Sequence, residues 1–383
     1  MKYERTAVSQ ATIKYVASQF QILGDFIGGE PYGSGHINDT FSVSFCQGGA
    51  LVRYIFQRIN HGIFQDPEGL MDNIQRVTAQ SAQVMKGSGE GQISRKTLTV
   101  ISSRDGKPYV VDPTGYYWRS YIFIEKAKTY DRIENEKQAY EAAKAFGQFQ
   151  GMVADMKGER LNETIPDFHN TKKRYQALMR AIEKDACNRA AGVKAEIEFF
   201  TEREADTRRL IELLENGLLP ERVAHNDCKL NNVMIDDETG EGVCVIDLDT
   251  VMPGLSLYDF GDMVRTATSP ALEDEPDVSL VTMQMPMFEA LVKGFIRGAG
   301  EALCAEELAQ MPFSGKLITM ETGIRFLTDY LEGDQYFKTH REGHNLDRCR
   351  TQIALVRSIE AQLEAMDAVV EHCAKEVELS CVS

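Results

Sequence analysis

The chain has 383 residues, of which 43% are hydrophobic, and its formal net charge is −16. That length exceeds what a single hydrophobic core usually serves, so we expect two lobes. The negative charge disfavours a nucleic acid or an anionic membrane as a partner, because phosphate groups attract basic surfaces. Residues 1–125 hold 12 Lys and Arg against 11 Asp and Glu, whereas the remainder holds 30 against 47. The acidity of the second part would favour a cationic substrate or simply keep a surface solvated.

The cysteines and the first residues bear on where the protein works. Eight cysteines are scattered without a Cys-x-x-Cys pair, which is typical of reduced thiols rather than of a disulfide framework or a zinc site. The first ten residues, MKYERTAVSQ, lack an apolar core of signal-peptide length, and no run reaches the ~18 apolar residues of a membrane span. We therefore expect a cytoplasmic, monomeric protein without a membrane segment.

The first third of the chain is predicted to be mostly strands. Residues 7–20 have the apolar spacing of a short helix, and residues 41–45 (FSVSF) alternate as a strand does. Another strand is predicted at 51–60, followed by a helix that begins after Asp66. Two or three further antiparallel strands are expected next, the first of them at 98–101.

Near Glu125 to Ala127 the pattern changes from strands to long helices. We expect an α+β fold with a β-rich, antiparallel lobe at 1–125, a mainly helical lobe at 126–383, and a cleft between them where ligands commonly bind. Helices are predicted at 131–156, 171–188, 195–216, 281–298, 316–331 and 348–376.

The stretch from His225 to Asp262 carries the clearest chemical pattern. Asp227 and Asn232 lie five residues apart, and an apolar run then leads to Asp247. In phosphoryl-transfer enzymes of the protein-kinase type, an Asp and an Asn with this spacing lie on the catalytic loop, and a later Asp at the end of a hairpin binds Mg²⁺. Each residue alone could instead cap a loop or close a turn. The three together, with a strand between them, favour phosphoryl transfer.

The chemistry explains these residue types. Phosphoryl transfer depends on positioning and on neutralising charge on oxygens, with one carboxylate orienting the attacking hydroxyl. Asp227 suits that catalytic role. Magnesium prefers one or two carboxylates and takes its other ligands from phosphate and water, so Asn232 and Asp247 are the expected metal ligands. ATP is the expected co-substrate.

A glycine-rich turn near the start would fit a nucleotide phosphate. It spans Pro31 to Thr40 (PYGSGHINDT), and glycine lets the backbone approach a phosphate because no Cβ intervenes. It lacks the Gly-Lys-Ser/Thr ending of a P-loop, and a plain turn is the alternative. The third strand lacks the lysine that kinases use for the α- and β-phosphates. Gln57 and Arg58 stand there instead, and Arg58 could supply the charge.

Several neighbouring residues allow more than one role. His225 is expected to orient the catalytic loop, and Lys229 either reaches the γ-phosphate or is a solvated loop residue. Asp259 is expected to begin a helix as an N-cap or to brace the catalytic loop. The pair His340 and His344 has metal-site spacing, but a structural or substrate-loop role is favoured because Gly343 weakens a helix there.

The motifs HNDCKLNN and VIDLDTVMPGLSLYDFGD resemble those of the aminoglycoside phosphotransferase and choline kinase group, whose fold is protein-kinase-like. The resemblance runs from Gly33 to about Arg357. Three runs, at 56–60, 247–255 and 321–331, are more narrowly similar to bacterial N-acetylhexosamine 1-kinases. That group shares the Gln-Arg-Ile-Asn string, so the missing lysine bears on phosphate binding more than on activity.

The resemblance implies roles for particular residues. Asp227 would be the catalytic base, Asn232 and Asp247 would hold Mg²⁺, and the β-rich lobe would bind the nucleotide. The expected nucleotide contacts are Gly33, Ser34, Gly35, Asn38, Thr40 and Arg58, with an adenine hinge near Glu125 and Ala127. The expected substrate contacts are His36, Asp227, Asp249, Arg325 and Tyr336.

The sequence thus predicts an ATP- and Mg²⁺-dependent small-molecule kinase. The resemblance implies that its acceptor is the anomeric hydroxyl of an N-acetylhexosamine or hexose, as in carbohydrate metabolism. An aminoglycoside or amino-alcohol kinase of the choline or homoserine type is the alternative, supported by the acidic second lobe. A nucleotide-binding pseudokinase is a further alternative because the third-strand lysine is missing, although such a module has no chemical reason to keep Asp227, Asn232 and Asp247.

Overall fold

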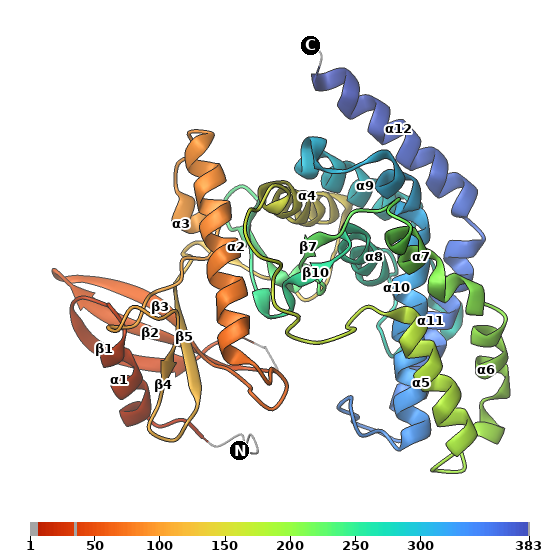
Figure 1. Ribbon diagram of the computed structural model, residues 1–383, viewed down its shortest axis with the longest axis horizontal. Helices are drawn as coiled ribbons and strands as arrows, with labels where there is room; N and C mark the ends of the chain where they lie inside the picture. Colours follow the sequence, from red (N-terminus) through yellow and green to blue (C-terminus); the bar gives the residue numbers. More distant parts are fainter. Residues whose placement is uncertain (1–6, 34–36, 382–383) are drawn as a thin grey trace.

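The computed structural model describes residues 7–33 and 37–381, and it has a strand-rich and a helix-rich part (Figure 1). The strand-rich part is an antiparallel sheet of five strands in the order β1-β2-β3-β5-β4, with the helix α1 (Gln10–Gln19) packed on it. The mixed α+β architecture predicted from the sequence is confirmed. The strands are β1 (Asp25–Pro31), β2 (Asp39–Gln47), β3 (Ala50–Arg58), β4 (Val110–Val111) and β5 (Tyr117–Ile122).

The long helix α2 (Pro67–Gly87) lies between the sheet and the helical part (Figure 1). It begins where expected, because the carboxylate of Asp66 accepts a hydrogen bond of 2.9 Å from the amide of Gly69 and proline occupies the first helical position. The short helix α3 (Ile93–Lys96) follows.

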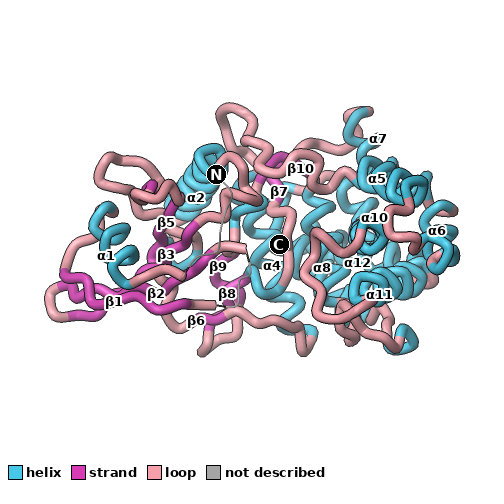
Figure 2. Tube along the Cα trace, turned by 90° about the horizontal axis from the view of Figure 1, so that it is seen from below, coloured by secondary structure: helices cyan, strands magenta, loops and turns pink. Residues whose placement is uncertain are grey.

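Two small sheets frame the segment that carries the catalytic pattern. The chain leaves β5 and forms β6 (Ala127–Lys128), which pairs with β8 (Val233–Asp236), and β8 pairs with β9 (Gly242–Val245). On the other side, β7 (Arg222–Ala224) pairs with β10 (Met252–Gly254). Figure 2 shows β6, β8 and β9 between the first sheet and the helices. Residues 225–232 and 246–251 are therefore loops with both ends fixed.

The helical part forms the larger core, which also includes one face of α2. Its helices α4 and α9 pack closely, since a Cβ added at Gly294 or Gly298 would collide with backbone carbonyls of α4. The described residues contain no helix long and apolar enough to cross a membrane. The helices are α4 (Glu136–Val153), α5 (Thr171–Lys184), α6 (Lys194–Thr201), α7 (Arg209–Glu215), α8 (Ser256–Ala267), α9 (Met285–Ala299), α10 (Ala305–Glu332), α11 (His344–Glu360) and α12 (Leu363–Cys381).

Several predicted boundaries were wrong. No strand forms at 98–101, where only Val100 bridges to β5. The helix expected at 195–216 is α6 and α7, separated by a 3-10 turn, and the one expected at 348–376 is α11 and α12. The helix α10 starts eleven residues before the expected Lys316. This start was not predicted because Pro312, a residue type that usually interrupts a helix, lies inside α10. The helix begins with a capping box between Cys304 and Glu307.

Candidate active site

A cavity of about 540 Å³ lies between the two lobes and brings six of the predicted site residues together. Its size is typical of small-molecule sites, which measure roughly 300–1,000 Å³. Its walls include Gly33 and Asn38 from the connection between β1 and β2, Thr40 from β2, and Asp227, Asn232 and Asp247 from the helical lobe. Ser34, Gly35 and His36 lie outside the described residues.

Asp227 is held by two neighbours on the catalytic loop. The ammonium of Lys229 lies 2.6 Å from Oδ1 of Asp227, and the amide nitrogen of Asn232 donates to Oδ2 at 3.1 Å and to the backbone carbonyl at 2.8 Å. Burial opposes ionisation of Asp227, but the charge and hydrogen bond of Lys229 outweigh it and lower the pKa of Asp227. An ionised Asp227 can accept a hydrogen bond from a substrate hydroxyl. Lys229, left open by the sequence, is thus paired with the candidate base.

Asp247 follows β9 and faces the cavity in a left-handed backbone conformation, with φ of 58°. Enclosure in the cleft, together with the carboxylates of Asp249 and Asp227, raises the pKa of Asp247 to about 7. Throughout the described chain no positively charged side chain forms a salt bridge with it. A carboxylate beside two others fits a cation, and the amide oxygen of Asn232 would supply a second oxygen ligand.

A metal ion here would need ligands from outside the protein. Residues 7–33 and 37–381 hold no group of three or more His, Cys, Asp or Glu side chains arranged for a metal. Asn232 and Asp247 are only two ligands, which suits Mg²⁺ completed by phosphate oxygens and water. The donor set therefore fits the ion that the sequence predicts, with the nucleotide as part of the site.

The catalytic loop is braced from α8 by Asp259. This side chain is fully buried and accepts hydrogen bonds from the amides of His225 at 2.9 Å and Asn226 at 2.7 Å. Gln150 of α4 donates a third bond at 2.7 Å. Asp259 lies inside α8, which begins at Ser256. The N-cap expectation is therefore wrong, and the bracing alternative is the one observed.

His225 has a structural role in this geometry, as expected. Its Nε2 lies 2.9 Å from the carbonyl oxygen of Ile246, and its Nδ1 lies 3.3 Å from the amide nitrogen of Asp227. One ring nitrogen donates and the other accepts, which is the pattern of a neutral imidazole. The ring thus ties the catalytic loop to the end of β9, next to Asp247.

His169, which the sequence did not single out, reaches the same loop from the opposite side. Its Nδ1 lies 2.8 Å from Glu321 of α10, and its Nε2 lies 3.0 Å from the carbonyl oxygen of Asn226. The hydroxyl of Thr171 donates to the other oxygen of Glu321 at 2.6 Å. Burial would lower the pKa of His169, but the Glu321 carboxylate outweighs it and raises this pKa. Asn226, with φ of 64°, is therefore held between α8 and α10.

Arg58 does not line the cavity, which corrects the expectation for the third strand. Adjacent residues of a strand point to opposite faces, and Gln57 takes the cavity face. Arg58 pairs instead with Asp39 at 2.6 Å and stacks on the ring of Tyr116 at 4.6 Å. The sheet instead presents Arg119 to the cavity, directly opposite Gln57 in the neighbouring strand β5.

Arg119 connects the sheet to the loop after β9. Its Nε donates to Gln57 at 2.8 Å, and its Nη1 forms an ion pair with Asp249. The other carboxylate oxygen of Asp249 accepts from the amide of Asn38 at 2.5 Å. Asp249 is 3% exposed, so both of its oxygens are engaged inside the lobe junction. The structure therefore does not place Asp249 on the cavity wall, where a sugar contact was expected.

The residues expected to form an adenine hinge do not line the cavity. Phe123 and Ile124 line the cavity, whereas Glu125 and Ala127 do not. The carboxylate of Glu125 turns away to Arg53, with one hydrogen bond of 2.9 Å. Ala127 is buried in β6.

The two late substrate residues lie together but outside this cavity. The guanidinium of Arg325 lies over the rings of Phe168 at 5.6 Å, Phe337 at 5.4 Å and Tyr336 at 6.0 Å. Tyr336 is 71% exposed. Phe168 precedes His169, so this aromatic and cationic cluster is connected to the catalytic loop through the contact of His169 with Asn226.

The histidine pair near the end shows no metal geometry. Nδ1 of His344 accepts from the amide of His340 at 3.2 Å, and Nε2 of His344 lies 2.9 Å from Asp274. These contacts fix the start of α11. They are consistent with the structural role that the sequence favoured.

Comparison with known proteins places this geometry in a family. A family model described as "Phosphotransferase enzyme family" matches residues 28–291, more than half of the chain. An aminoglycoside phosphotransferase from Alicyclobacillus acidocaldarius superposes with a TM-score of 0.61 at 13% identity, covering 97% of this chain and 98% of that one. A microcompartment-associated aminopropanol kinase gives 0.54 at 14% identity, with 93% and 98% covered.

A third similar structure is spectinomycin phosphotransferase in complex with ADP and spectinomycin, with a TM-score of 0.52, 12% identity, and coverage of 94% and 99%. At these identities the likeness concerns the fold, which is the predicted two-lobed, kinase-like one. The narrower resemblance to N-acetylhexosamine 1-kinases stays a prediction. By the match over residues 28–291 and the fold it shares, the chain belongs to the phosphotransferase enzyme family.

Proposed function

We propose that this phosphotransferase is an ATP- and Mg²⁺-dependent kinase that phosphorylates the anomeric hydroxyl of an N-acetylhexosamine or hexose. The observation that carries the phosphoryl-transfer part is the convergence of Asp227, Asn232 and Asp247 on one cavity between the lobes. An ionised carboxylate, an amide oxygen and a second carboxylate are what transfer from a magnesium nucleotide requires.

The residues of the chain divide the work of the reaction. Asp227 accepts a hydrogen bond from the acceptor hydroxyl, orients its oxygen toward the γ-phosphorus and takes its proton as the new P–O bond forms. The bond to the β,γ-bridging oxygen breaks, and ADP leaves with that oxygen. Asn232 and Asp247 would hold Mg²⁺, which would neutralise charge on the phosphate oxygens.

Gln57 and Arg119 take the place of the missing lysine in this proposal. Both line the cavity, and they are hydrogen-bonded to each other at 2.8 Å. Arg119 brings a permanent positive charge to the phosphate side, and Gln57 adds neutral donor capacity. The ion pair of Arg119 with Asp249 holds Arg119 close to Asp247. A pseudokinase would need neither this arrangement nor an ionised Asp227.

The acceptor part of the proposal rests on the resemblance and on a cationic cluster. Arg174 lies near Arg325, and neither forms a salt bridge in the part of the chain that the structure describes. The Nε of Arg174 is buried without a hydrogen-bond partner, and burial together with the charge of Arg325 lowers the pKa of Arg174. Two guanidinium groups beside the exposed ring of Tyr336 favour an oxygen-rich acceptor and repel a cationic one.

An aminoglycoside or amino-alcohol kinase is the second candidate. The acidic helical lobe favours it, and structures of similar fold carry the names aminoglycoside phosphotransferase and aminopropanol kinase. The test is a panel in which ATP and Mg²⁺ are combined with free hexoses, N-acetylhexosamines, aminoglycosides and amino alcohols, with ADP release measured. We expect turnover with a sugar. Turnover of an amino compound with every sugar inert would refute the sugar assignment.

A further inference from the structure

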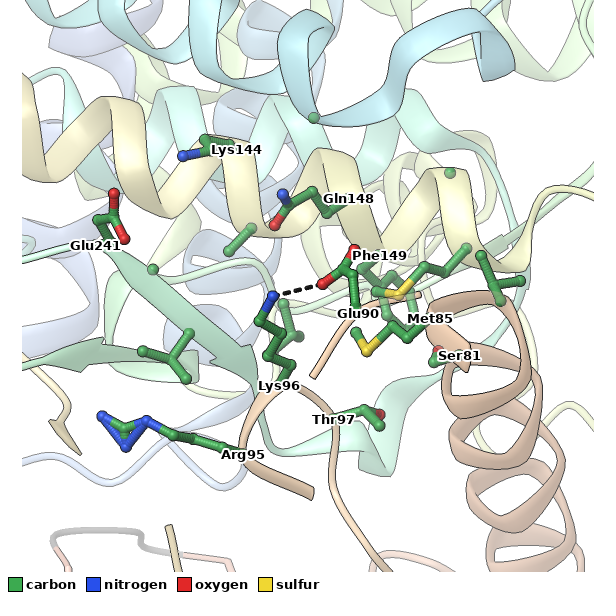
Figure 3. Close-up of a pocket in the computed structure, with 18 of the residues that line it drawn as sticks. Ser81, Met85, Glu90, Arg95, Lys96, Thr97, Lys144, Gln148, Phe149 and Glu241 are labelled. Carbon is green, nitrogen blue, oxygen red and sulfur yellow. Dashed lines mark hydrogen bonds and ion pairs between the residues drawn. The ribbon is translucent and has the colours of Figure 1, made fainter. Parts of the chain in front are cut away.

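A second cavity, of about 470 Å³, is separate from the catalytic cavity, and Figure 3 shows residues that line it. It is lined by α2, α4, β9 and the segment 90–97, and it shares no lining residue with the catalytic cavity. Val243 and Val245 of β9 face it, whereas Asp247, just beyond that strand, faces the catalytic cavity. The end of β9 and the start of the following turn therefore form a thin wall between two separate spaces.

The inner wall of this second cavity is apolar and adaptable. Met85 of α2 and Phe149 and Met152 of α4 line it together with Leu248. Figure 3 shows Met85 and Phe149 close together on one side. Methionine side chains adjust to irregular apolar shapes and make favourable contacts with aromatic rings. The wall thus suits an aromatic or branched apolar group.

Two hydroxyl groups open into the same space without partners. Ser81 is 1% exposed and Thr97 is 8% exposed, and both line the cavity. Among the described residues no side-chain hydrogen bond is formed by either hydroxyl. Hydroxyls that line a cavity and have no partner in the protein can bond to water or to a ligand, so an occupant of this cavity has two hydrogen-bonding positions available.

The charged side chains of the wall are largely paired within the protein. Lys96 lies 2.5 Å from Glu90, and Arg95 lies 2.5 Å from Asp236. Lys144 lies 3.4 Å from Glu141. An anionic ligand would have to displace one of these pairs, whereas a neutral one would not.

We propose that this cavity binds an uncharged, amphipathic small molecule that regulates the nucleotide cleft. Its apolar body would rest on Met85, Phe149 and Met152, and its polar head would bond to Ser81 and Thr97. The occupant would touch α2 of one lobe and α4 of the other, and it would press on Leu248, the residue after Asp247. Binding there would therefore act on the candidate metal ligand through the peptide bond that joins Asp247 to Leu248.

The probe for this site is benzamide, which combines an aromatic ring with a neutral amide. Its binding is followed by ligand-observed NMR on the full chain. We expect saturable binding that Thr97→Val weakens by about two- to tenfold, the loss of one hydrogen bond. Ser81→Leu, whose side chain fills the space, should abolish it. The control variant is Thr78→Val. Thr78 lies on α2, as Ser81 does, but its hydroxyl already donates to the carbonyl oxygen of Ile74 at 2.8 Å, so this variant should leave benzamide binding unchanged.

If benzamide binds the wild type, Thr97→Val and Ser81→Leu with equal affinity, it binds at another place. If no saturable binding of benzamide is observed, the cavity holds only water. Either result overturns the proposed site, whatever the enzyme's substrate is. Coupling rests on the proposed function and is measured separately, with ADP and Mg²⁺ added. The dissociation constants of benzamide and ADP should then change by the same factor. A factor of one would refute the coupling.

Discussion

The guanidinium group of Arg119 and the carboxylate of Asp249 form a buried ion pair that joins the two lobes. Arg119 enters from β5 beside Gln57, and Asp249 lies two residues after the candidate metal ligand Asp247. In the proposed function, the charge that kinases take from a third-strand lysine would therefore come from the neighbouring strand. The same arginine also fixes the loop that presents Asp247.

Replacing Arg119 by methionine should destabilise the fold. The change leaves Asp249 buried and unpaired, a situation that costs about 3–5 kcal/mol. Unfolding in urea measures the difference. The double variant Arg119→Met/Asp249→Asn removes the stranded charge and should recover part of the loss. Arg119→Lys keeps the charge, but a lysine cannot hydrogen-bond to Gln57 and Asp249 at the same time, so its loss of stability should be intermediate. A double variant no more stable than Arg119→Met would contradict this account.

Replacing Asp227 by asparagine should remove turnover while nucleotide binding persists. Loss of a general base costs about 10²–10⁴ in rate, whereas the phosphate-facing residues are untouched. The measurements are kcat for ADP release and the dissociation constant of ADP. Asp237→Asn, in the exposed turn after β8, is the matched control and should keep full activity. Similar kcat values for wild type and Asp227→Asn would exclude Asp227 as the base.

Removing Mg²⁺ should stop the reaction, and replacing a metal ligand should raise the Mg²⁺ concentration that the reaction needs. EDTA is expected to abolish turnover, and added Mg²⁺ should restore it. Asp247→Asn loses the charged ligand, so the Mg²⁺ concentration for half-maximal activity should rise at least about tenfold, the effect of roughly 1.4 kcal/mol. Asp277→Asn changes an exposed carboxylate far along the chain and should not shift this concentration. An unchanged Mg²⁺ requirement in Asp247→Asn would show that the ion binds elsewhere.

The part of the site that the sequence predicted is the part built from local pattern. Asp227, Asn232 and Asp247 lie within one short segment, and the reaction sets the spacing between them. They could therefore be identified in the sequence without knowledge of the three-dimensional structure. Arg119 and Asp249 meet across 130 residues, and His169 and Glu321 meet across 152. No local spacing encodes such contacts. The sequence predicts Arg58 and gives no sign of Arg119, because the face to which a strand residue points depends on the partner strand and its register.

The link between His169 and Glu321 should make stability depend on pH in a defined window. The pKa of His169 is raised from its ordinary 6.5, so its contribution is complete below about pH 6.5 and is lost as pH rises through the raised value. The pKa of Glu321 is lowered from 4.5, so its contribution is complete above about pH 4.5 and is lost as pH falls through the lowered value. The pair is therefore at full strength between these two limits.

His169→Gln should consequently lose most stability relative to wild type at pH 5.5, with the difference shrinking toward pH 9, as measured by urea unfolding across this range. Because Nε2 of His169 lies 3.0 Å from the carbonyl oxygen of Asn226, the residue before Asp227, the variant should also lower kcat more than it raises the KM for ATP. His372→Gln replaces an exposed histidine of α12 and controls for the substitution itself. A stability difference that is constant with pH would mean that His169 acts through packing alone, since packing carries no proton.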